Sequence, residues 1–139
     1  DQPEPHAHQR NQCGGDMRIT VHEAREYFAH PSQHSLGKTE ADLPDWADYW
    51  ASGGACLMTH AAYWPGVVMV HIGAKPECWG FLDAPVKRLL KEIAESEGAD
   101  RLIAWISETN RAALALARRV GFSTDGYMPN GVFLLGWKG

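Results

Sequence analysis

Residues 71–90 read "HIGAKPECWGFLDAPVKRLL", and this stretch decides the fold that the sequence predicts. An apolar run ends at Ala74, a turn with Pro76 and Gly80 follows, and a helical pattern begins near Ala84. The predicted helix buries one face, formed by apolar residues at offsets of three, four, seven and eight: Val86, Leu89, Leu90, Ile93 and Ala94. A strand, a turn and a helix start in this order bind phosphate in many proteins, because the first N–H groups of a helix have no partner within it.

The sequence before this stretch predicts a strand and two helices. Residues 17–31 are typical of a short strand that enters a helix, and Pro31 is expected to end that helix. Residues 44–52 are expected to form a second helix, with Gly53-Gly54 as its stop. One face of this second helix would carry aromatic residues: Trp46, Tyr49 and Trp50.

The remaining elements complete an alternation of strands and helices. Residues 55–64 and 66–74 are typical of a hairpin that turns at Pro65-Gly66. After the helix that Gly98 is expected to end, the pattern predicts a strand at 101–106, a helix at 107–122 capped by Thr109 or Asn110, and a strand at 131–137. This order predicts an α/β (α+β) domain over residues 17–139, with helices on the faces of a mixed sheet.

Composition limits the partners and the compartment. The chain has 139 residues, 45% of them hydrophobic, and a formal net charge of -4. This size allows one sizeable core, and the acidic balance disfavours nucleic acid as a partner. No apolar run approaches the roughly 18 residues that a membrane helix requires, so no membrane partner is expected. The three cysteines are widely spaced and predict reduced thiols, which is typical of a cytoplasmic protein.

Residues 1–16 are polar, with prolines and a Gly-Gly pair, so we expect an N-terminal arm outside the core. Such an arm becomes ordered mainly on a partner surface, either a different protein or a second copy of the chain. Aromatic residues in excess of what a small core requires favour a protein interface as well, although a core role is the alternative for each: Trp46, Tyr49, Trp50, Tyr63, Trp64 and Trp79.

The segment "ETNRAALALARRVGF", residues 108–122, is similar to a signature of the GNAT superfamily of acyl-CoA-dependent N-acyltransferases. The similar positions are Asn110, Ala113, Leu116, Gly121 and Phe122. The order of elements over residues 56–137 resembles that family too, as does "KPECWG" at residues 75–80. The resemblance implies a single GNAT-like domain with a mixed, mostly antiparallel central sheet flanked by helices.

The resemblance also implies an acyl-CoA loop between the strand and the helix of the opening stretch. In the family, Arg/Gln-x-x-Gly-x-Gly/Ala presents backbone N–H groups to a pyrophosphate at the helix start. These three positions fall on Trp79, Leu82 and Ala84, so that only the last one matches. The cofactor-binding residues implied by the resemblance are Ala74, Trp79, Gly80, Phe81, Leu82, Ala84 and Asn110.

Asp83, within this loop position, and Pro85, directly after it, argue against the usual pyrophosphate site. Asp83 is expected to be the N-cap of the helix, where its carboxylate would take the place of the phosphate and repel it. Pro85 removes one further N–H donor from the first turn. The loop is therefore a degenerate version of the family's.

The catalytic groups that the resemblance implies are only partly present. Many family members carry a Tyr general acid directly after the signature Leu, and Ala117 stands there in this chain. The titratable residue of the central strand is His71, whose imidazole is suited to deprotonate an ammonium group. A hydrogen-bonded packing role is the alternative for His71.

Other reactive side chains are better explained without a role in metal binding or catalysis. His6, His8 and Cys13 have metal ligand types, but a polar tail explains them better, and no metal site is predicted. Cys78 has no assignable His/Asp partner set and is expected to be a plain thiol.

Two functions of different classes follow from these residues. The first is an N-acyltransferase that uses acetyl-CoA or another acyl-CoA, with His71 as its base. The second is a catalytically inactive GNAT-like structural or assembly module without a cofactor, because the loop is degenerate and the Tyr is absent. The size and style of the chain also resemble GNAT-like proteins of tailed bacteriophages, which would make the module a virion component.

Overall fold

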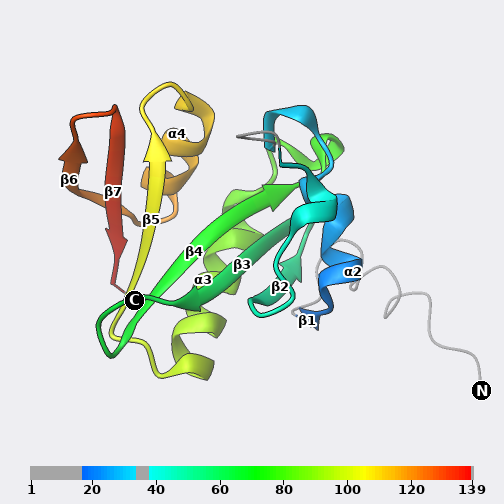
Figure 1. The fold of residues 1–139 in the computed structure, drawn as a ribbon, viewed down its shortest axis with the longest axis horizontal. Helices are drawn as coiled ribbons and strands as arrows, with labels where there is room; N and C mark the ends of the chain where they lie inside the picture. The colour runs from blue at the N-terminus through cyan, green and yellow to red at the C-terminus, as the bar shows by residue number, and fades with distance from the viewer. Residues whose placement is uncertain (1–16, 34–37, 139) are drawn as a thin grey trace, which may run out of the picture.

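A seven-stranded sheet with the order β1-β2-β3-β4-β5-β7-β6 forms the centre of the fold in the computed structural model, which describes residues 17–33 and 38–138 (Figure 1). The strands are β1 (Met17–Ile19), β2 (Asp48–Ser52), β3 (Ala55–Ala61), β4 (Val67–Ala74), β5 (Arg101–Ser107), β6 (Ser123–Met128) and β7 (Val132–Trp137). β4 and β5 are parallel, and the other neighbours are antiparallel. The expected α/β (α+β) class, with a mixed, mostly antiparallel sheet flanked by helices, is confirmed.

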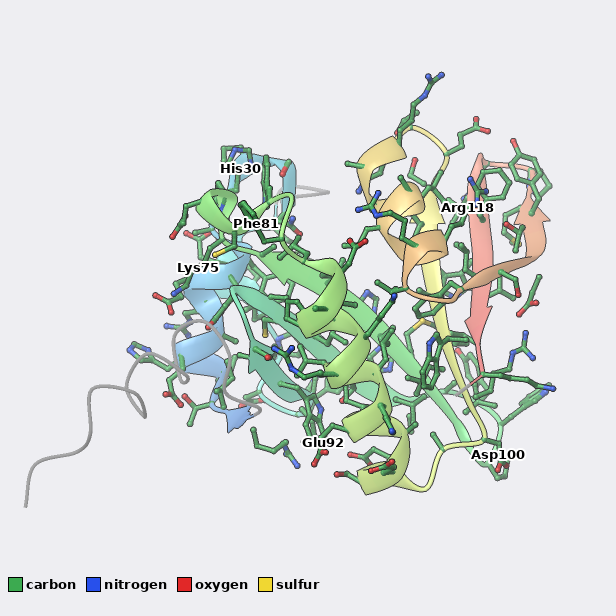
Figure 2. All side chains as sticks on the ribbon, turned by 180° about the vertical axis from the view of Figure 1, so that it is seen from behind. His30, Lys75, Phe81, Glu92, Asp100 and Arg118 are labelled. Atoms are coloured by element: carbon green, nitrogen blue, oxygen red, sulfur yellow. The ribbon has the colours of Figure 1, made fainter. Side chains whose placement is uncertain are left out.

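Helices cover both faces of this sheet. The α-helices are α2 (Val21–Ala24), α3 (Asp83–Glu97) and α4 (Arg111–Arg119), and the 3-10 helices are η1 (Arg25–Phe28), η2 (Pro31–Gln33), η3 (Glu40–Asp42) and η4 (Pro76–Cys78). α3 and α4 contribute to one core on the same face of the sheet, as Figure 2 shows from behind. α2 and η1 pack on the opposite face against β2 and β4.

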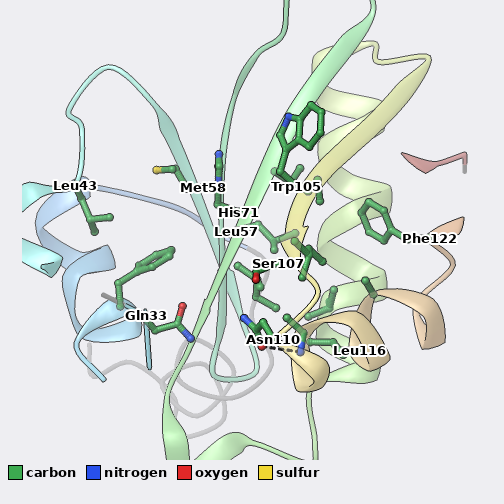
Figure 3. Close-up of a pocket in the computed structure, with 18 of the residues that line it drawn as sticks. Gln33, Leu43, Leu57, Met58, His71, Trp105, Ser107, Asn110, Leu116 and Phe122 are labelled. Carbon is green, nitrogen blue, oxygen red and sulfur yellow. Dashed lines mark hydrogen bonds between the residues drawn. The ribbon is translucent and has the colours of Figure 1, made fainter. Parts of the chain in front are cut away.

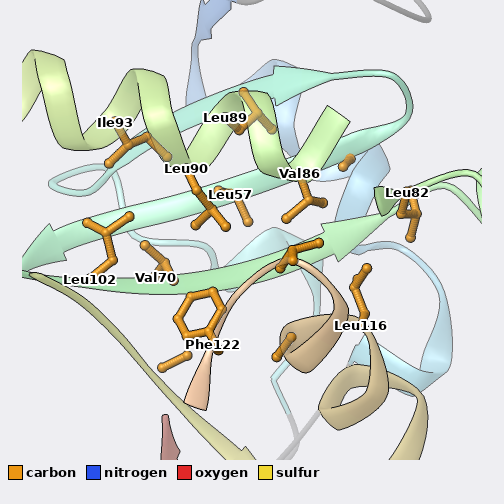
Figure 4. Packing of buried hydrophobic residues seen from close by; sticks show 14 of the residues in the cluster. Leu57, Val70, Leu82, Val86, Leu89, Leu90, Ile93, Leu102, Leu116 and Phe122 are labelled. Atoms are coloured by element: carbon orange, nitrogen blue, oxygen red, sulfur yellow. The ribbon is translucent and has the colours of Figure 1, made fainter. Parts of the chain in front are cut away.

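The larger core lies between α3, α4 and the sheet (Figure 4). Leu89, Leu90 and Ile93 of α3 have no solvent exposure, which confirms the predicted buried face of this helix. They pack over Leu57 and Val70 of the neighbouring strands β3 and β4. Full burial of such a side chain contributes roughly 1.5 to 3 kcal/mol, so this interface is a main source of stability.

Several predicted element ends are confirmed. Gly98 ends α3 in the left-handed conformation, with φ 60°, and its N–H bonds back to the last turn. Asn110 caps α4, because its side-chain oxygen accepts a hydrogen bond from the N–H of Ala113. The hairpin predicted over residues 55–74 is formed by β3 and β4, which pair antiparallel from Ala55–Ala74 to Ala61–Val68.

The predicted helix at residues 44–52 is wrong, since this segment contains strand β2. Gly53 and Gly54 turn the chain between β2 and β3 with φ values of 57° and 82°. Positive φ at both central residues is the requirement of a two-residue type I′ hairpin, so the pair is a turn rather than a helix stop. Tyr49 and Trp50 consequently point to opposite faces of the sheet and enter different cores.

The predicted helix before Pro31 is also wrong in extent. α2 has only four residues, begins with a capping box between Thr20 and Glu23, and continues as 3-10 helix to Phe28. Pro31 starts a further 3-10 turn. This segment lies very close to β4, because a Cβ at Gly73 would come within 2.7 Å of the Phe28 ring and of the Tyr27 carbonyl oxygen. Only glycine allows this approach.

Strand β6 was not predicted from the sequence. It begins with polar residues, is mostly exposed, and lies at the sheet edge next to β7. The expected arm at residues 1–16 lies outside the described residues. Among the helices of the described residues, none is long and apolar enough to cross a membrane.

Candidate functional site

The parallel strands β4 and β5 stay paired over only part of their length. Val67–Met69 pair with Arg101–Ile103, and beyond this point the two strands separate, as Figure 1 shows. β4 remains paired with β3, and β5 with β7, so each strand continues on its own side. A cavity of about 420 Å³ lies between the separated halves (Figure 3).

The walls of this cavity differ in polarity. Apolar side chains of α3, α4 and the following segment form one part: Val86, Leu90, Ala113, Leu116, Ala117, Val120 and Phe122. Phe28, Leu43 and Met58 line it from the face that carries α2 and η1. Polar residues line it as well: Gln33, Lys38, Thr39, Glu40, Asp42, Ser107 and Asn110. An elongated ligand with an apolar and a polar part would fit such walls.

His71 is the titratable residue of β4 in this cavity, as the sequence predicts. Burial, and then the neighbouring His60, lower the pKa of His71 to about 4. The imidazole is therefore neutral at pH 7 and keeps a lone pair that can accept a proton. Its catalytic role remains a prediction, and so does the alternative of a hydrogen-bonded packing residue, because its Nε2 atom lies 3.2 Å from Nε2 of His60.

Two residues at the start of α4 complete the polar part of the wall. Asn110 lines the cavity while its Oδ1 atom is 3.2 Å from the N–H of Ala113, so the side-chain oxygen serves as a helix cap (Figure 3). The Oγ atom of Ser107 lies 2.9 Å from the hydroxyl of Thr109. The Asn110 side-chain N–H group and the Ser107 hydroxyl are the donors that these residues can offer to a ligand.

The other predicted cofactor residues lie outside this cavity, from the end of β4 to the first turn of α3: Ala74, Trp79, Gly80, Phe81, Leu82 and Ala84. Trp79 packs edge-on against His30, with 4.9 Å between ring centroids. Leu82 is only 8% exposed and belongs to the core, whereas Phe81 is 78% exposed and Gly80 has open space around it. Phe81 and Ala84 line a second, separate cavity. Their role in binding remains a prediction.

The expectation that Asp83 caps α3 is wrong. Leu82 is the N-cap residue and makes no side-chain cap hydrogen bond. The Asp83 carboxylate instead accepts hydrogen bonds from the Nε of Arg119 at 2.9 and 3.2 Å, which joins the start of α3 to the end of α4. The N–H groups of Asp83 and Ala84 have no partner within the helix, so they remain able to meet an anion.

The remaining side chains of the sequence hypotheses are placed away from this chemistry. Ala117, at the position of the family's Tyr, is buried in the cavity wall. Burial raises the pKa of Cys56 to about 12, and Cys78, the last residue of η4, forms no disulfide. Among the described residues, no three His, Cys, Asp or Glu side chains could hold a metal ion. His6, His8 and Cys13 lie outside the described part of the chain.

Several cavity residues were not singled out from the sequence. Trp105 and Ser107 on β5 alternate with buried Ala104 and so point away from the core. The sequence offered no clear signal for these two residues, because the exposure of Trp105 is known only from the structure. Leu43 and Met58 carried no signal, because apolar residues in these places are typical of any core.

The described strands contain one parallel pair, β4 and β5, which α3 connects along the chain. The chain has the fold of the GNAT acetyltransferases. It is similar to the aminoglycoside acetyltransferase AAC(6')-Ib in complex with coenzyme A, with a TM-score of 0.66 and 16% identity over 88% of this chain and 93% of that one. It is also similar to the ribosomal-protein-S5-alanine acetyltransferase of Vibrio fischeri, with a TM-score of 0.60 and 12% identity over 88% and 91%.

A third similar structure is a GNAT-family acetyltransferase of Bacillus anthracis, with a TM-score of 0.55 and 12% identity. The match covers 66% of this chain and 65% of the length of that protein. No protein-family model and no curated protein sequence matches the chain. The similarity to solved structures therefore establishes the fold, and the function must be argued from the site.

Proposed function

We propose that this protein is an acyltransferase that moves the acyl group of an acyl-CoA to an amine bound in the cavity between β4 and β5. The observation that carries this proposal is the separation of the two parallel strands around a 420 Å³ cavity. Separated strands leave alternate backbone N–H and C=O groups without a partner strand on that side. An extended chain with amide groups, such as the pantetheine arm of CoA, can pair with these groups.

The residues that line the cavity fit the acyl end of such a ligand. Val86, Leu116 and Ala117 provide apolar surface, and the backbone N–H groups of β4 can polarise a thioester carbonyl. A bound acyl-CoA supplies the activated thioester. His71 is available as the proton acceptor for the amine, because it is neutral and lines the same cavity.

The residues at the expected pyrophosphate position depart from the family's pattern. Trp79 and Leu82 replace the Arg/Gln and the first Gly, and the carboxylate of Asp83 lies beside the helix start. The free N–H groups of the first turn and the Arg119 guanidinium offset part of this charge. We therefore expect acyl-CoA to bind with micromolar rather than nanomolar affinity.

Isothermal titration calorimetry of the full chain with acetyl-CoA tests this proposal. We expect a Kd in the micromolar range, and thiol release from acetyl-CoA when primary amines such as spermidine, glycinamide or a lysine peptide are added. No heat at millimolar acetyl-CoA would overturn the proposal. Binding without thiol release would leave the site assignment standing and point to a different acceptor.

A pair of matched variants tests the location of the site. Ser107→Trp places a large ring at the exposed edge of the cavity, and we expect it to weaken acetyl-CoA binding at least tenfold. Ser123→Trp makes the same change at an exposed position of β6 away from the cavity, and binding should be unchanged. Equal effects of both variants would contradict a site between β4 and β5.

The inactive module remains a second hypothesis, and one feature favours it. Ala117 removes the family's proton donor, so no tyrosine hydroxyl stands beside the cavity at that position. The similar structures named above are acetyltransferases, and they give no support to the resemblance to bacteriophage proteins. We retain a protein partner or self-association as a proposal, because Trp46, Tyr63 and Trp64 are 70%, 97% and 72% exposed.

A further inference from the structure

Two imidazole rings meet beside the cavity. His60 on β3 and His71 on β4 are diagonal neighbours on one face of the sheet, since His60 pairs with Met69 and Met58 pairs with His71. Their Nε2 atoms are 3.2 Å apart, and the ring planes differ by 22°. The ring centroids are 5.3 Å apart, so both nitrogens lie in the space between the rings. An imidazole N–H lies in its ring plane, and this geometry therefore fits a hydrogen bond between the two nitrogens.

The backbone of Ala61 decides the direction of this hydrogen bond. The Nδ1 atom of His60 lies 3.1 Å from the carbonyl oxygen of Ala61. A carbonyl oxygen only accepts, so Nδ1 of His60 carries a proton, and Nε2 of the neutral ring keeps its lone pair. His71 must then donate from its own Nε2 atom. Its Nδ1 atom is left as the basic nitrogen.

We propose that His60 is a positioning residue, which holds His71 as the Nε2–H tautomer and so keeps Nδ1 free to take a proton from an amine in the cavity. The role of the amine rests on the proposed acyl transfer. The tautomer itself does not, because it follows from the contacts among His60, His71 and Ala61.

The pair can also pass the proton on. As the amine nitrogen bonds to the acyl carbon and the C–S bond breaks, one amine proton moves to Nδ1 of His71, and the Nε2 proton of His71 moves to Nε2 of His60. In this step the positive charge passes to His60, which is outside the cavity lining and whose ring centroid is 5.5 Å from that of the exposed Trp46 ring. The Nε2 proton then returns from His60 to His71, and solvent carries the Nδ1 proton of His71 to the departing thiolate. An amine and a thioester thus give an amide and a thiol, and the Nε2–H form of His71 is restored.

Other charged groups that share the cavity with His71 come from the segment around η3: Lys38, Glu40 and Asp42. One cation and two anions give this wall a small net charge. His60 is the titratable group in hydrogen-bond contact with His71 among the described residues, and its charge lowers the pKa of His71 further than burial alone.

Long-range ¹H–¹⁵N NMR of the labelled full chain at pH 7.5 reads the tautomer directly, with His71→Gln assigning the His71 signals. We expect the Nε2–H form of His71 in the wild type and in His60→Gln, whose amide oxygen still accepts a hydrogen bond. In His60→Phe, which keeps a ring beside Trp46 without an acceptor, we expect this preference to be lost. An Nδ1–H form in the wild type, or an unchanged Nε2–H form in His60→Phe, would overturn the proposal.

Acyl transfer provides a second readout with any amine that the wild type accepts. His60→Phe should lower kcat at least tenfold with an unchanged KM for acetyl-CoA. His60→Gln should recover part of this loss, because it orients His71 but takes no proton. If the wild type neither binds nor consumes acetyl-CoA, the proposed function fails, while the NMR result still decides the tautomer.

Discussion

His71 makes the stability of the protein depend on pH. Its pKa is lowered to about 4 in the folded state, by burial first and by His60 second, against about 6.5 in the unfolded chain. Between these values the unfolded state binds more protons, so the free energy of unfolding falls as pH decreases from about 6.5 to 4. The full loss is about 3 kcal/mol, and it is absent above pH 7.

Urea unfolding between pH 7.5 and 4.5 measures this dependence. In His71→Asn, which has no titrating ring, the free energy of unfolding should fall less over that range than in the wild type. His22→Asn is the control, because His22 is exposed on α2 and its replacement should leave the slope unchanged. If the free energy of unfolding of His71→Asn changes with pH as steeply as that of the wild type, the pH dependence belongs to other groups.

Asp83 limits the affinity for acyl-CoA under the proposed function. Its carboxylate lies at the start of α3 and is paired with Arg119, and both side chains are about half exposed. Asp83→Asn removes a negative charge from the helix start and frees the guanidinium, so acetyl-CoA should bind about three- to tenfold more tightly by calorimetry.

Asp48→Asn is the matched control for this change. It breaks a similarly exposed pair with Arg18 on β1 and β2, and β2 lies two strands from β4. Its acetyl-CoA affinity should equal that of the wild type. An equal gain in both variants would indicate a general effect of net charge, and no gain in Asp83→Asn would mean that the phosphates lie elsewhere.

At the scale of elements, the loop between β4 and α3 is held by its buried residue. From the sequence, Leu82 stands where the family keeps a glycine, which suggests that Leu82→Gly would open the loop. The structure argues against this substitution, because Leu82 is 8% exposed within the larger core. Leu82→Ala should lower the free energy of unfolding by about 2 to 4 kcal/mol in urea titrations.

Phe81→Ala provides the comparison from the adjacent position. Phe81 is 78% exposed, so its replacement should change stability by less than about 0.5 kcal/mol. Similar losses for both variants would contradict the packing of this loop. The loop is thus attached to the core at Leu82 and open to solvent at Phe81.

The helices and strands that could be predicted are those with a regular spacing of apolar residues or a residue typical of a helix end. α3 and α4 show apolar residues at helical spacing, and Gly98 and Asn110 mark their ends. β2 was mistaken for a helix because three aromatic residues suggested a helical face, although Gly53-Gly54 is a typical hairpin turn. β6 was not predicted because an exposed edge strand needs no alternation of apolar and polar residues. The Asn130-Gly131 turn was its only signal in the sequence.

The candidate site was predictable only where the chemistry of one residue is distinctive. His71 is a titratable residue in an apolar strand, and that contrast is visible in the sequence. The cavity depends on where β4 and β5 stop pairing, which is a property of the twisted sheet as a whole rather than of either strand. Its partner His60 could not be predicted either, because contact with His71 depends on the register of β3 against β4.

At the scale of the whole molecule, the cavity lies along a seam. β1 to β4 with their helices form one side, β5 to β7 with α4 form the other, and direct strand pairing joins them only from Val67–Arg101 to Met69–Ile103. α3 and the larger core connect the two sides as well. A ligand that pairs with both strands would therefore extend the sheet interaction across the seam.

Hydrogen exchange measured by mass spectrometry tests this view of the whole molecule. We expect saturating acetyl-CoA to slow exchange in peptides that contain residues 70–74 and 104–107, because a bound pantetheine chain would pair with backbone groups that face the cavity. Peptides from β6, which lies two strands from the seam, should exchange at the same rate with and without ligand. Protection confined to residues 77–88 would instead place acetyl-CoA in the second cavity, and it would refute a site between β4 and β5.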